Sequence, residues 1–281
     1  MMRRVVFEPS YAGWRAAARR LIDDGLEPDA VLWEESSDEQ ASLEGLTETR
    51  AAEGADRPSA FRVPRRFVEL AEAAACHADL ERWAVLYRVL WRLTHGEPAL
   101  MEVAVDLDVH RLLRMEKAVR REVHKMHAFV RFRAVEHEGG EHYVAWFEPE
   151  HHVVERSAPF FADRFPSMRW SILTPRVSAH WDGERLTYAP GAPRSAAPTD
   201  DALESLWRTY YASVFNPARL KPGAMRAEMP LRYWRNLPEA SLIVPLAQEA
   251  PARVRRMIEE QNRAKEPRGK RARADRKDVS K

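Results

Sequence analysis

The sequence predicts an α+β fold, in which helices bracket an antiparallel sheet of about five strands and a basic C-terminal tail is disordered. Before residue 128, apolar residues recur mainly at helical spacing. Between residues 128 and 190 they alternate with polar residues, as in half-buried strands. Turn-forming residues separate these alternating stretches, and apolar helical patterns return after residue 200.

The N-terminal residues predict a strand followed by an amphipathic helix. "RRVVFEP" has strand character, and "YAGWRAAARRLIDDG" places Trp14, Ala17, Ala18 and Leu21 on one helical face. The short apolar stretch "AVLW" follows. "VPRRFVELAEAAACH" and "LERWAVLYRVLWRLTHG" then predict a helical hairpin whose second helix ends near Gly96.

The middle of the chain predicts a helix and then the sheet. A helical apolar stripe is formed by Leu112, Met115, Val119, Val123 and Met126. From Ala128 the period becomes two, so we expect a strand there, a turn in "EHEGGEH" and a return strand in "YVAWFEP". "SAPFFADRF" predicts a short helix. "MRWSILT", "RVSAHWDG" and "ERLTYAP" predict three further strands, with a turn at Asp182-Gly183.

The C-terminal part predicts further helices in "DALESLWRTYYASVF", "EASLIVPLAQEA" and "PARVRRMIEEQ". We therefore expect an N-terminal strand and helix at 1–33, an acidic mobile loop at 34–62, a main α+β domain at 63–261 and a disordered basic tail at 262–281. Charge supports this division, since residues 1–56 hold thirteen acidic residues against six Lys/Arg, and residues 263–277 hold eight Lys/Arg against two acidic residues.

Composition narrows the class of protein. Cys76 is the only cysteine, which excludes an internal disulfide and fits a reducing compartment. The sequence has neither an apolar run long enough to span a bilayer nor a signal-peptide core, so we expect a soluble cytoplasmic protein without membrane contact. It also lacks a Gly-rich phosphate loop, and no cofactor is predicted.

One helix face is a candidate nucleic-acid-binding surface. Lys117, Arg120, His124 and His127 are spaced to form a cationic ridge beside the apolar stripe, and Arg131 and Arg133 continue it into the first strand. Phosphate backbones bind such ridges in a salt-dependent way. The alternative interpretation is an ordinary solvated helix face.

The histidines are the candidate catalytic residues. Acid–base catalysis by His124, His127, His151 or His180, with a carboxylate such as Asp182, is one hypothesis. Hydrogen-bonded structural histidines are the alternative. No HExxH motif or CxxC pair frames a metal site, and no metal is predicted.

The segment from Phe215 to Ala240 mixes cations, aromatic residues and four prolines. Prolines divide it into short turns. Aromatic residues can stack on bases while arginines hold phosphates, so its candidate binding residues are Arg219, Lys221, Arg232, Tyr233 and Trp234. The alternative is a structural cap whose aromatic residues belong to the core, and we expect Tyr233 or Trp234 to point inward. We also expect this segment to share one surface with the ridge.

Several long motifs resemble a bacterial family that is associated with DNA repair but has no established reaction. They are "HKMHAFVRFR", "YVAWFEPEHHVV", "FFADRF", "WSILTP", "HWDG" and "FNPARLKPGAMRAEMPLRYWRNLPEA", and the resemblance runs from about Val63 to Met257. Family members are found fused to uracil-DNA glycosylase-like domains and paired with a radical-SAM protein of DNA modification or repair. The resemblance implies DNA as a partner, including damaged or uracil-containing DNA, and a radical-SAM companion.

Three hypotheses follow. The chain is a DNA-binding repair accessory that uses the ridge and the 215–240 segment. Alternatively, it is a nucleic-acid-processing enzyme with His124, His127, His151, His180 and Asp182 around one pocket, or a docking module for the companion without DNA contact. The sequence leaves open whether the chain is an enzyme.

Overall fold

The computed structural model describes residues 2–36, 61–103, 105–137, 140–198, 229, 231–234, 237 and 240–265. Two compact units make up the chain, and neither is continuous in sequence. Unit 1 comprises Met1–Ala128 and Pro149–Arg164, and unit 2 comprises Phe129–Glu148 and Phe165–Lys281. These units do not coincide with the expected division into 1–33 and 63–261.

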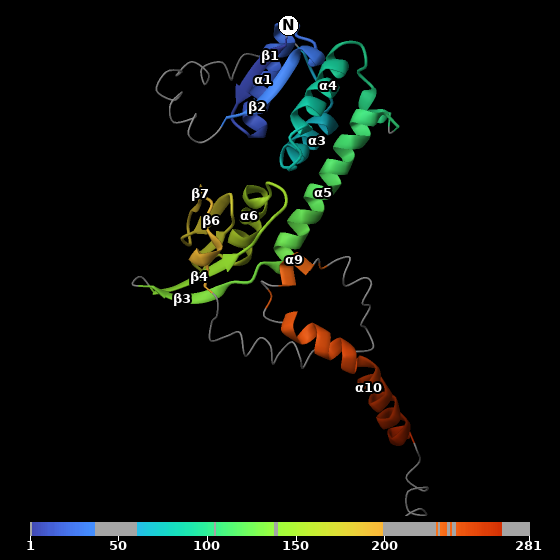
Figure 1. The fold of residues 1–281 in the computed structure, drawn as a ribbon, viewed down its shortest axis with the longest axis vertical. Helices are drawn as coiled ribbons and strands as arrows, with labels where there is room; N and C mark the ends of the chain where they lie inside the picture. Colours follow the sequence, from blue (N-terminus) through green and yellow to red (C-terminus); the bar gives the residue numbers. More distant parts are fainter. Residues whose placement is uncertain are drawn as a thin grey trace, which may run out of the picture. The chain divides into compact units, whose positions relative to one another are not determined.

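Unit 1 begins with a small βαβ arrangement (Figure 1). Strands β1 (Arg3–Phe7) and β2 (Val31–Glu35) pair in parallel, and α1 (Tyr11–Asp23) connects them, followed by a short 3-10 helix at Pro28–Ala30. Ser10 caps α1, because its Oγ accepts a hydrogen bond from the Gly13 backbone N–H at 3.0 Å. The predicted stripe is confirmed, since Trp14, Ala17, Ala18 and Leu21 are all buried.

The predicted helical hairpin is also confirmed. It consists of α3 (Arg65–Ala75) and α4 (Arg82–Thr94), and Gly96 follows α4 with a φ of 107°, a left-handed conformation that glycine adopts without strain. Trp83 of α4 lies in an aromatic cluster with Phe7 and Trp14, at ring distances of 5.1 and 6.4 Å. This cluster joins the hairpin to β1 and α1.

A buried arginine ties α4 to β2. The Arg82 side chain is 1% exposed and donates hydrogen bonds to the backbone oxygens of Ala75 and Asp79, both at 3.0 Å. Its third contact is an ion pair with Glu35 at 2.5 Å. Glu35 also accepts a hydrogen bond from the Trp83 indole at 2.8 Å. Glu34 and Glu35 belong to β2, whereas the sequence places them in the acidic loop expected at 34–62. Residues 37–60 of that loop lie outside the described residues.

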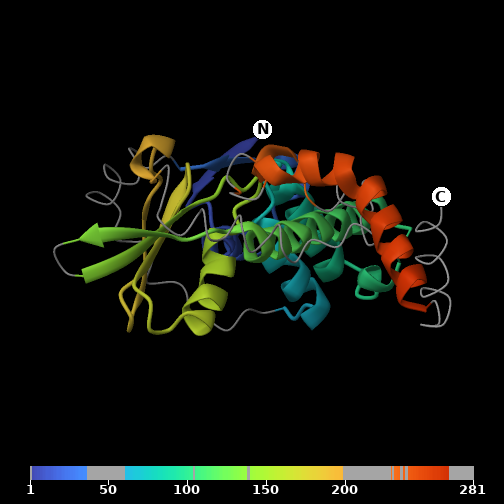
Figure 2. The same ribbon diagram turned by 90° about the horizontal axis from the view of Figure 1, so that it is seen from below.

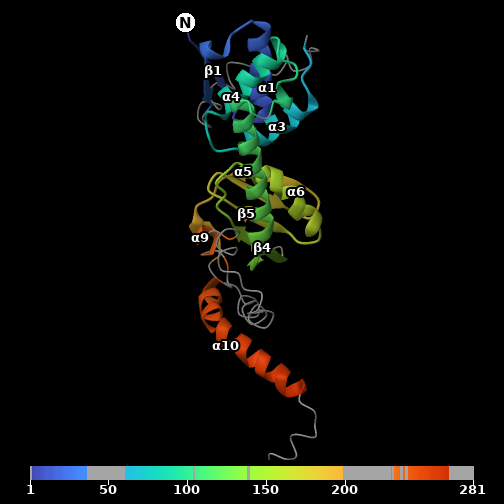
Figure 3. The same cartoon turned by 90° about the vertical axis from the view of Figure 1, so that its right-hand side faces the viewer.

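Three further elements complete unit 1: a 3-10 helix at Leu100–Glu102, α5 (Leu107–Phe129) and α6 (Val154–Arg164). The last residue of α5, Phe129, belongs to unit 2. The α5 helix is continuous in all three views (Figures 1, 2 and 3). It buries Leu112, Met115, Val119 and Met126 of the predicted stripe. It extends beyond the expected start of the first strand at Ala128, because burial of Met126 continues the helical pattern and the strand begins only at Arg133.

Unit 2 contains a five-stranded sheet with the order β3-β4-β5-β6-β7. Its strands are β3 (Arg133–His137), β4 (Gly140–Trp146), β5 (Trp170–Leu173), β6 (Val177–Trp181) and β7 (Leu186–Pro190), with a 3-10 helix at Arg194–Ala196. The predicted hairpin β3–β4 and the turn between β6 and β7 are confirmed, with Gly183 at a φ of 102°. In Figures 1 and 2, β3 and β4 extend past the other strands.

The sheet is mixed, which corrects the antiparallel expectation. The pairs β3–β4, β5–β6 and β6–β7 are antiparallel, but β4 and β5 are parallel. Parallel neighbours need a long crossover connection rather than a tight turn. Residues 147–169, which include α6, form that connection.

The C-terminal part of unit 2 contains α9 (Leu231–Trp234) and α10 (Ala240–Lys265). The two helices expected at 239–261 are confirmed as helical, but they form one helix that includes Pro245 and Pro251. The helix expected at 201–215 and the tail from residue 266 lie outside the described residues. Within the described part of the chain, no helix combines the length and low charge that crossing a membrane would require.

Candidate functional site

His180 and Asp182 line an open pocket of about 570 Å³ on the sheet of unit 2. The other residues that line it come from β4 to β7 and from the turns beside them: His142, Arg169, Ser171, Trp181, Glu184 and Thr187. The sheet register explains why they meet. Side chains alternate across a strand, and Ser171 is the direct partner of His180, so both point to the same face.

Ser171 lies between two imidazoles. Its hydroxyl oxygen is 2.9 Å from His142 Nε2 and 2.7 Å from His180 Nδ1, and the serine is 7% exposed. A hydroxyl has one proton, so it can donate to one neutral imidazole while accepting from the other. Burial lowers the pKa of His180, which favours its neutral form. A neutral imidazole beside a serine hydroxyl is the pairing that activates a serine nucleophile.

His142, Ser171 and His180 form a hydrogen-bonded set that we call the Ser171 relay. The hydrogen bonds of Asp182 lie in the turn after β6. Its Oδ1 accepts hydrogen bonds from the backbone N–H groups of Glu184 at 2.8 Å and Arg185 at 2.7 Å. These backbone hydrogen bonds lower the pKa of the Asp182 carboxyl group. The side chain therefore stabilises the turn between β6 and β7 as an ionised carboxylate, which argues against its predicted part in proton transfer.

His127 and His151, two of the other predicted catalytic residues, are packed side chains of unit 1. The His127 ring stacks on Phe160 at 4.0 Å and meets Phe161 edge-on at 5.6 Å. His151 is 9% exposed, its Nδ1 accepts a hydrogen bond from the Ala78 N–H at 3.3 Å, and its ring lies 4.3 Å from that of His77. Burial lowers the pKa of His127, so it favours the neutral form of this ring.

The predicted catalytic residues are divided between the two units. His180 and Asp182 share a pocket in unit 2, whereas His124, His127 and His151 belong to unit 1 and have other neighbours. His142 and Ser171 are not among the residues predicted from the sequence. One feature of the sequence marks Ser171, because this polar residue interrupts the apolar strand "WSIL". The strand sequence does not show which residues Ser171 contacts, since its contacts depend on pairing with other strands.

The predicted cationic ridge is in part a feature of α5. From residue 114 to residue 124, every exposed side chain of the helix is basic: Arg114, Lys117, Arg120, Arg121 and His124. We call these five residues the α5 stripe. The acidic residues of this stretch are used elsewhere, since Glu116 pairs with Arg66 at 2.6 Å and buried Glu122 accepts a hydrogen bond from the Glu150 N–H at 2.9 Å. Among the described residues, no member of the stripe forms an ion pair with a carboxylate, although Arg120 lies near enough to Glu116 to help lower the pKa of its carboxyl group.

Arg131 and Arg133, which the sequence also assigns to the ridge, donate hydrogen bonds to backbone oxygens. Both are half-buried residues of unit 2. Arg133 donates a hydrogen bond to the Pro198 backbone oxygen at 2.7 Å, and Arg131 donates one to the Val130 oxygen at 3.2 Å. Hydrogen bonding to the backbone favours a structural role for both guanidinium groups.

In the 215–240 segment, the described aromatic residues lie inward. Tyr233 is 2% exposed and stacks on Phe129 and Phe147 at ring distances of 5.6 and 5.1 Å. Half-buried Trp234 donates a hydrogen bond to the Met229 oxygen at 3.0 Å. The inward orientation of Tyr233 is confirmed, so this ring belongs to the core and does not offer a stacking surface for bases. Arg219 and Lys221 lie outside the described residues, as does the side chain of Arg232.

Comparison with known proteins gives one match. The model of a family described as DUF4130, domain of unknown function, matches residues 80–239. No curated protein and no solved structure matches the chain. The match includes the residues of the α5 stripe and those that line the pocket on the sheet.

Proposed function

The chain belongs to the DUF4130 family, whose function is unknown, and we propose that it binds DNA as an accessory protein of DNA repair or DNA metabolism. The α5 stripe is the observation that carries this proposal. Along about ten residues of helix, its basic side chains span ~15 Å. One strand of duplex DNA carries about four phosphates over that length. Four of the five residues are arginine or lysine: Arg114, Lys117, Arg120 and Arg121.

The chemistry of the stripe favours binding that is independent of sequence. Arginine and lysine side chains on an exposed helix face contact phosphate oxygens, and such contacts position a protein without reading base edges. Recognition of a lesion would then come from elsewhere. The resemblance to repair-associated proteins supports a radical-SAM companion in that role, with damaged or uracil-containing DNA as the shared substrate.

Neutralising the stripe is expected to weaken DNA binding and its salt dependence. In the triple variant Arg114→Gln, Lys117→Gln, Arg121→Gln, three phosphate contacts are lost, so the slope of log affinity against log salt becomes shallower by about 2.7. Fluorescence anisotropy with a labelled duplex over a series of salt concentrations measures this slope.

The matched control replaces three exposed arginines of unit 1 outside the stripe, Arg3, Arg20 and Arg65, by glutamine. Arg3 and Arg65 form only solvent-exposed ion pairs, so their loss changes stability little while net charge falls equally. Equal weakening in both variants would mean that net charge, not the stripe, attracts DNA. Absence of salt-dependent binding in the unmodified chain would leave the docking module as the better hypothesis.

A second candidate function is nucleic-acid processing, which the Ser171 relay favours. His180 Nδ1 would take the hydroxyl proton while Ser171 Oγ attacks the phosphorus of a phosphodiester. The bond from phosphorus to the leaving oxygen then breaks, and that oxygen takes the proton back from the imidazolium. Water would then hydrolyse the resulting phosphodiester of Ser171, which frees the serine hydroxyl and leaves a phosphate monoester on the nucleic acid. Arg169 in the pocket would offset negative charge.

If Ser171 is a nucleophile, Ser171→Ala should abolish cleavage of a labelled oligonucleotide, a loss of about 10³-fold or more. The rate should rise with pH through a value below the ordinary histidine pKa of about 6.5, because only neutral His180 accepts the proton and burial lowers its pKa. Thr187→Ala, which changes another hydroxyl of the pocket, is the control. Unchanged cleavage by the Ser171 variant would make the relay a structural hydrogen-bond network.

A further inference from the structure

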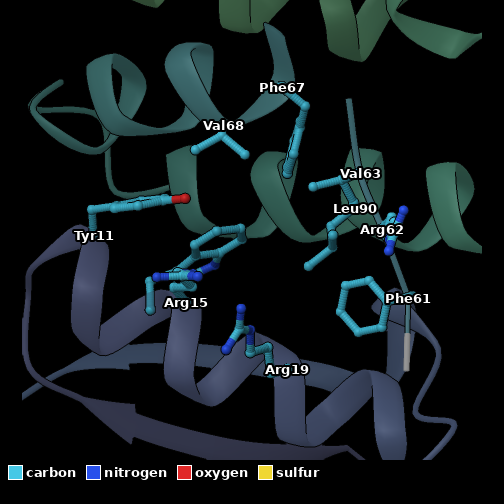
Figure 4. Close-up of a pocket in the computed structure, with 10 residues that line it drawn as sticks. Tyr11, Arg15, Arg19, Phe61, Arg62, Val63, Phe67, Val68 and Leu90 are labelled. Atoms are coloured by element: carbon cyan, nitrogen blue, oxygen red, sulfur yellow. The ribbon is translucent and has the colours of Figure 1, made fainter. Parts of the chain in front are cut away.

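A cavity of about 320 Å³ lies within unit 1, remote in sequence from the α5 stripe. Residues of α1, α3 and α4 line it, together with residues 61–63. Figure 4 shows Arg15 and Arg19 extending from α1 toward the space that Phe61 and Phe67 border. Its volume falls at the lower end of the range for small-molecule sites.

The lining divides into an apolar part and a cationic part. Phe61, Val63, Phe67 and Leu90 supply apolar surface. A second group supplies positive charge: Arg15, Arg19 and Arg62. None of the described residues that line the cavity is acidic. A site with one aromatic wall and several guanidinium groups is complementary to a planar ring that carries an anionic group.

These three arginines differ from most others of unit 1. Arg66, Arg82, Arg88, Arg92 and Arg111 each form an ion pair with a carboxylate. Among the described residues, Arg15, Arg19 and Arg62 form none. Their guanidinium donors are thus available to a ligand, and arginine binds phosphate or carboxylate through two parallel hydrogen bonds.

The pKa of the Tyr11 phenol is affected by charges near the cavity, including those of Arg15 and Arg19. Burial raises the pKa of Tyr11, the charge of Arg15 opposes that rise, the charge of Glu72 adds to it, and the charge of Arg19 also opposes it. Both guanidinium groups therefore lie close enough to the cavity wall to act on a group within it. Arg19 is half-buried, so its field is screened less than that of a fully exposed arginine.

We propose that this cavity binds a small aromatic anion of mononucleotide size, with its ring against Phe61 and Phe67 and its phosphate or carboxylate on Arg15 and Arg19. The site is too small for a nucleic-acid duplex, and its arginines belong to α1 rather than α5. It is therefore a separate ligand site whose existence does not depend on DNA binding.

Isothermal titration calorimetry on the full chain tests the proposal with four probes: AMP, adenosine, inorganic phosphate and 2-aminobenzoate. AMP should bind at least about tenfold more tightly than adenosine or phosphate, because, of these three probes, AMP alone joins a ring to a charged group. Tighter binding of 2-aminobenzoate than of AMP would identify an aromatic carboxylic acid as the source of the same chemistry. Adenosine or phosphate binding as tightly as AMP would overturn the proposal, as would no binding of any probe.

Two variants locate the binding. Arg15→Gln with Arg19→Gln should weaken AMP binding by about tenfold or more, since charge-assisted hydrogen bonds are lost. Arg20→Gln, which removes an exposed arginine from the same helix, should leave it unchanged. Val68→Trp should block the ring site without changing charge. Unaltered AMP affinity in both the double variant and Val68→Trp would overturn the assignment to this cavity.

Discussion

Replacing Arg82 by methionine is expected to lower the free energy of unfolding by about 3–5 kcal/mol, because it leaves the partner of a buried ion pair without its counter-charge. Three groups each lose one donor: the backbone oxygens of Ala75 and Asp79 and the carboxylate of Glu35. The guanidinium carbon also lies 4.3 Å from the centre of the Trp83 ring, a cation–π contact that methionine cannot replace. Urea unfolding followed by circular dichroism measures the change.

Arg65→Met is the control for that measurement. Arg65 pairs with Glu69 on the surface of α3, where its side chain is 92% exposed, so the loss should be only about 0.3–0.5 kcal/mol. If Arg82→Met costs no more than the control, the buried pair contributes little beyond the packing of its aliphatic chain. The link between α4 and β2 would then rest on other contacts, such as the hydrogen bond from Trp83 to Glu35 and the edge-on contact of Trp33 with Tyr87.

Tyr233→Ala is the second substitution with a large expected effect, a loss of about 3–5 kcal/mol in the stability of unit 2. The ring is stacked between Phe129 and Phe147, with an interplanar angle of 8° to the latter. Its removal leaves a cavity against both rings, because the Tyr233 side chain is buried. Denaturant unfolding measures the loss.

Tyr188→Ala removes the same side chain from β7 of the same unit, where the tyrosine is 42% exposed. Surface substitutions of this kind change stability by about 0.5 kcal/mol. If the two variants lost the same free energy of unfolding, the stacking of buried Tyr233 would contribute no more to stability than the exposed Tyr188 side chain does. The segment around α9 would then be held by other contacts.

Local features of the fold could be predicted from the sequence because their causes are local. The buried face of α1 follows from the spacing of Trp14, Ala17, Ala18 and Leu21, and the turn at Gly183 follows from a residue that tolerates positive φ. The α5 stripe was foreseen for the same reason at Lys117, Arg120 and His124. His127 shares that helical spacing, yet it packs on Phe160, which is distant in sequence.

Features that depend on pairing between distant segments could not be predicted. Alternation identifies β4 and β5 as strands but does not state that they are parallel neighbours. The Ser171 relay has the same origin, because His142, Ser171 and His180 come from three strands whose order only the sheet reveals. Arg133 looked like a surface cation in the sequence, but its acceptor is the backbone oxygen of Pro198.

The interleaving of the two units has a consequence for how the chain can be divided. It passes from one unit to the other after residues 128, 148 and 164. No single cut therefore yields two complete units, since a break after residue 164 separates β3 and β4 from β5, β6 and β7. During synthesis, β4 leaves the ribosome before α6 and must wait for β5 as its second neighbour. Gene fragments that encode either unit alone would need a new junction in place of the segment they omit.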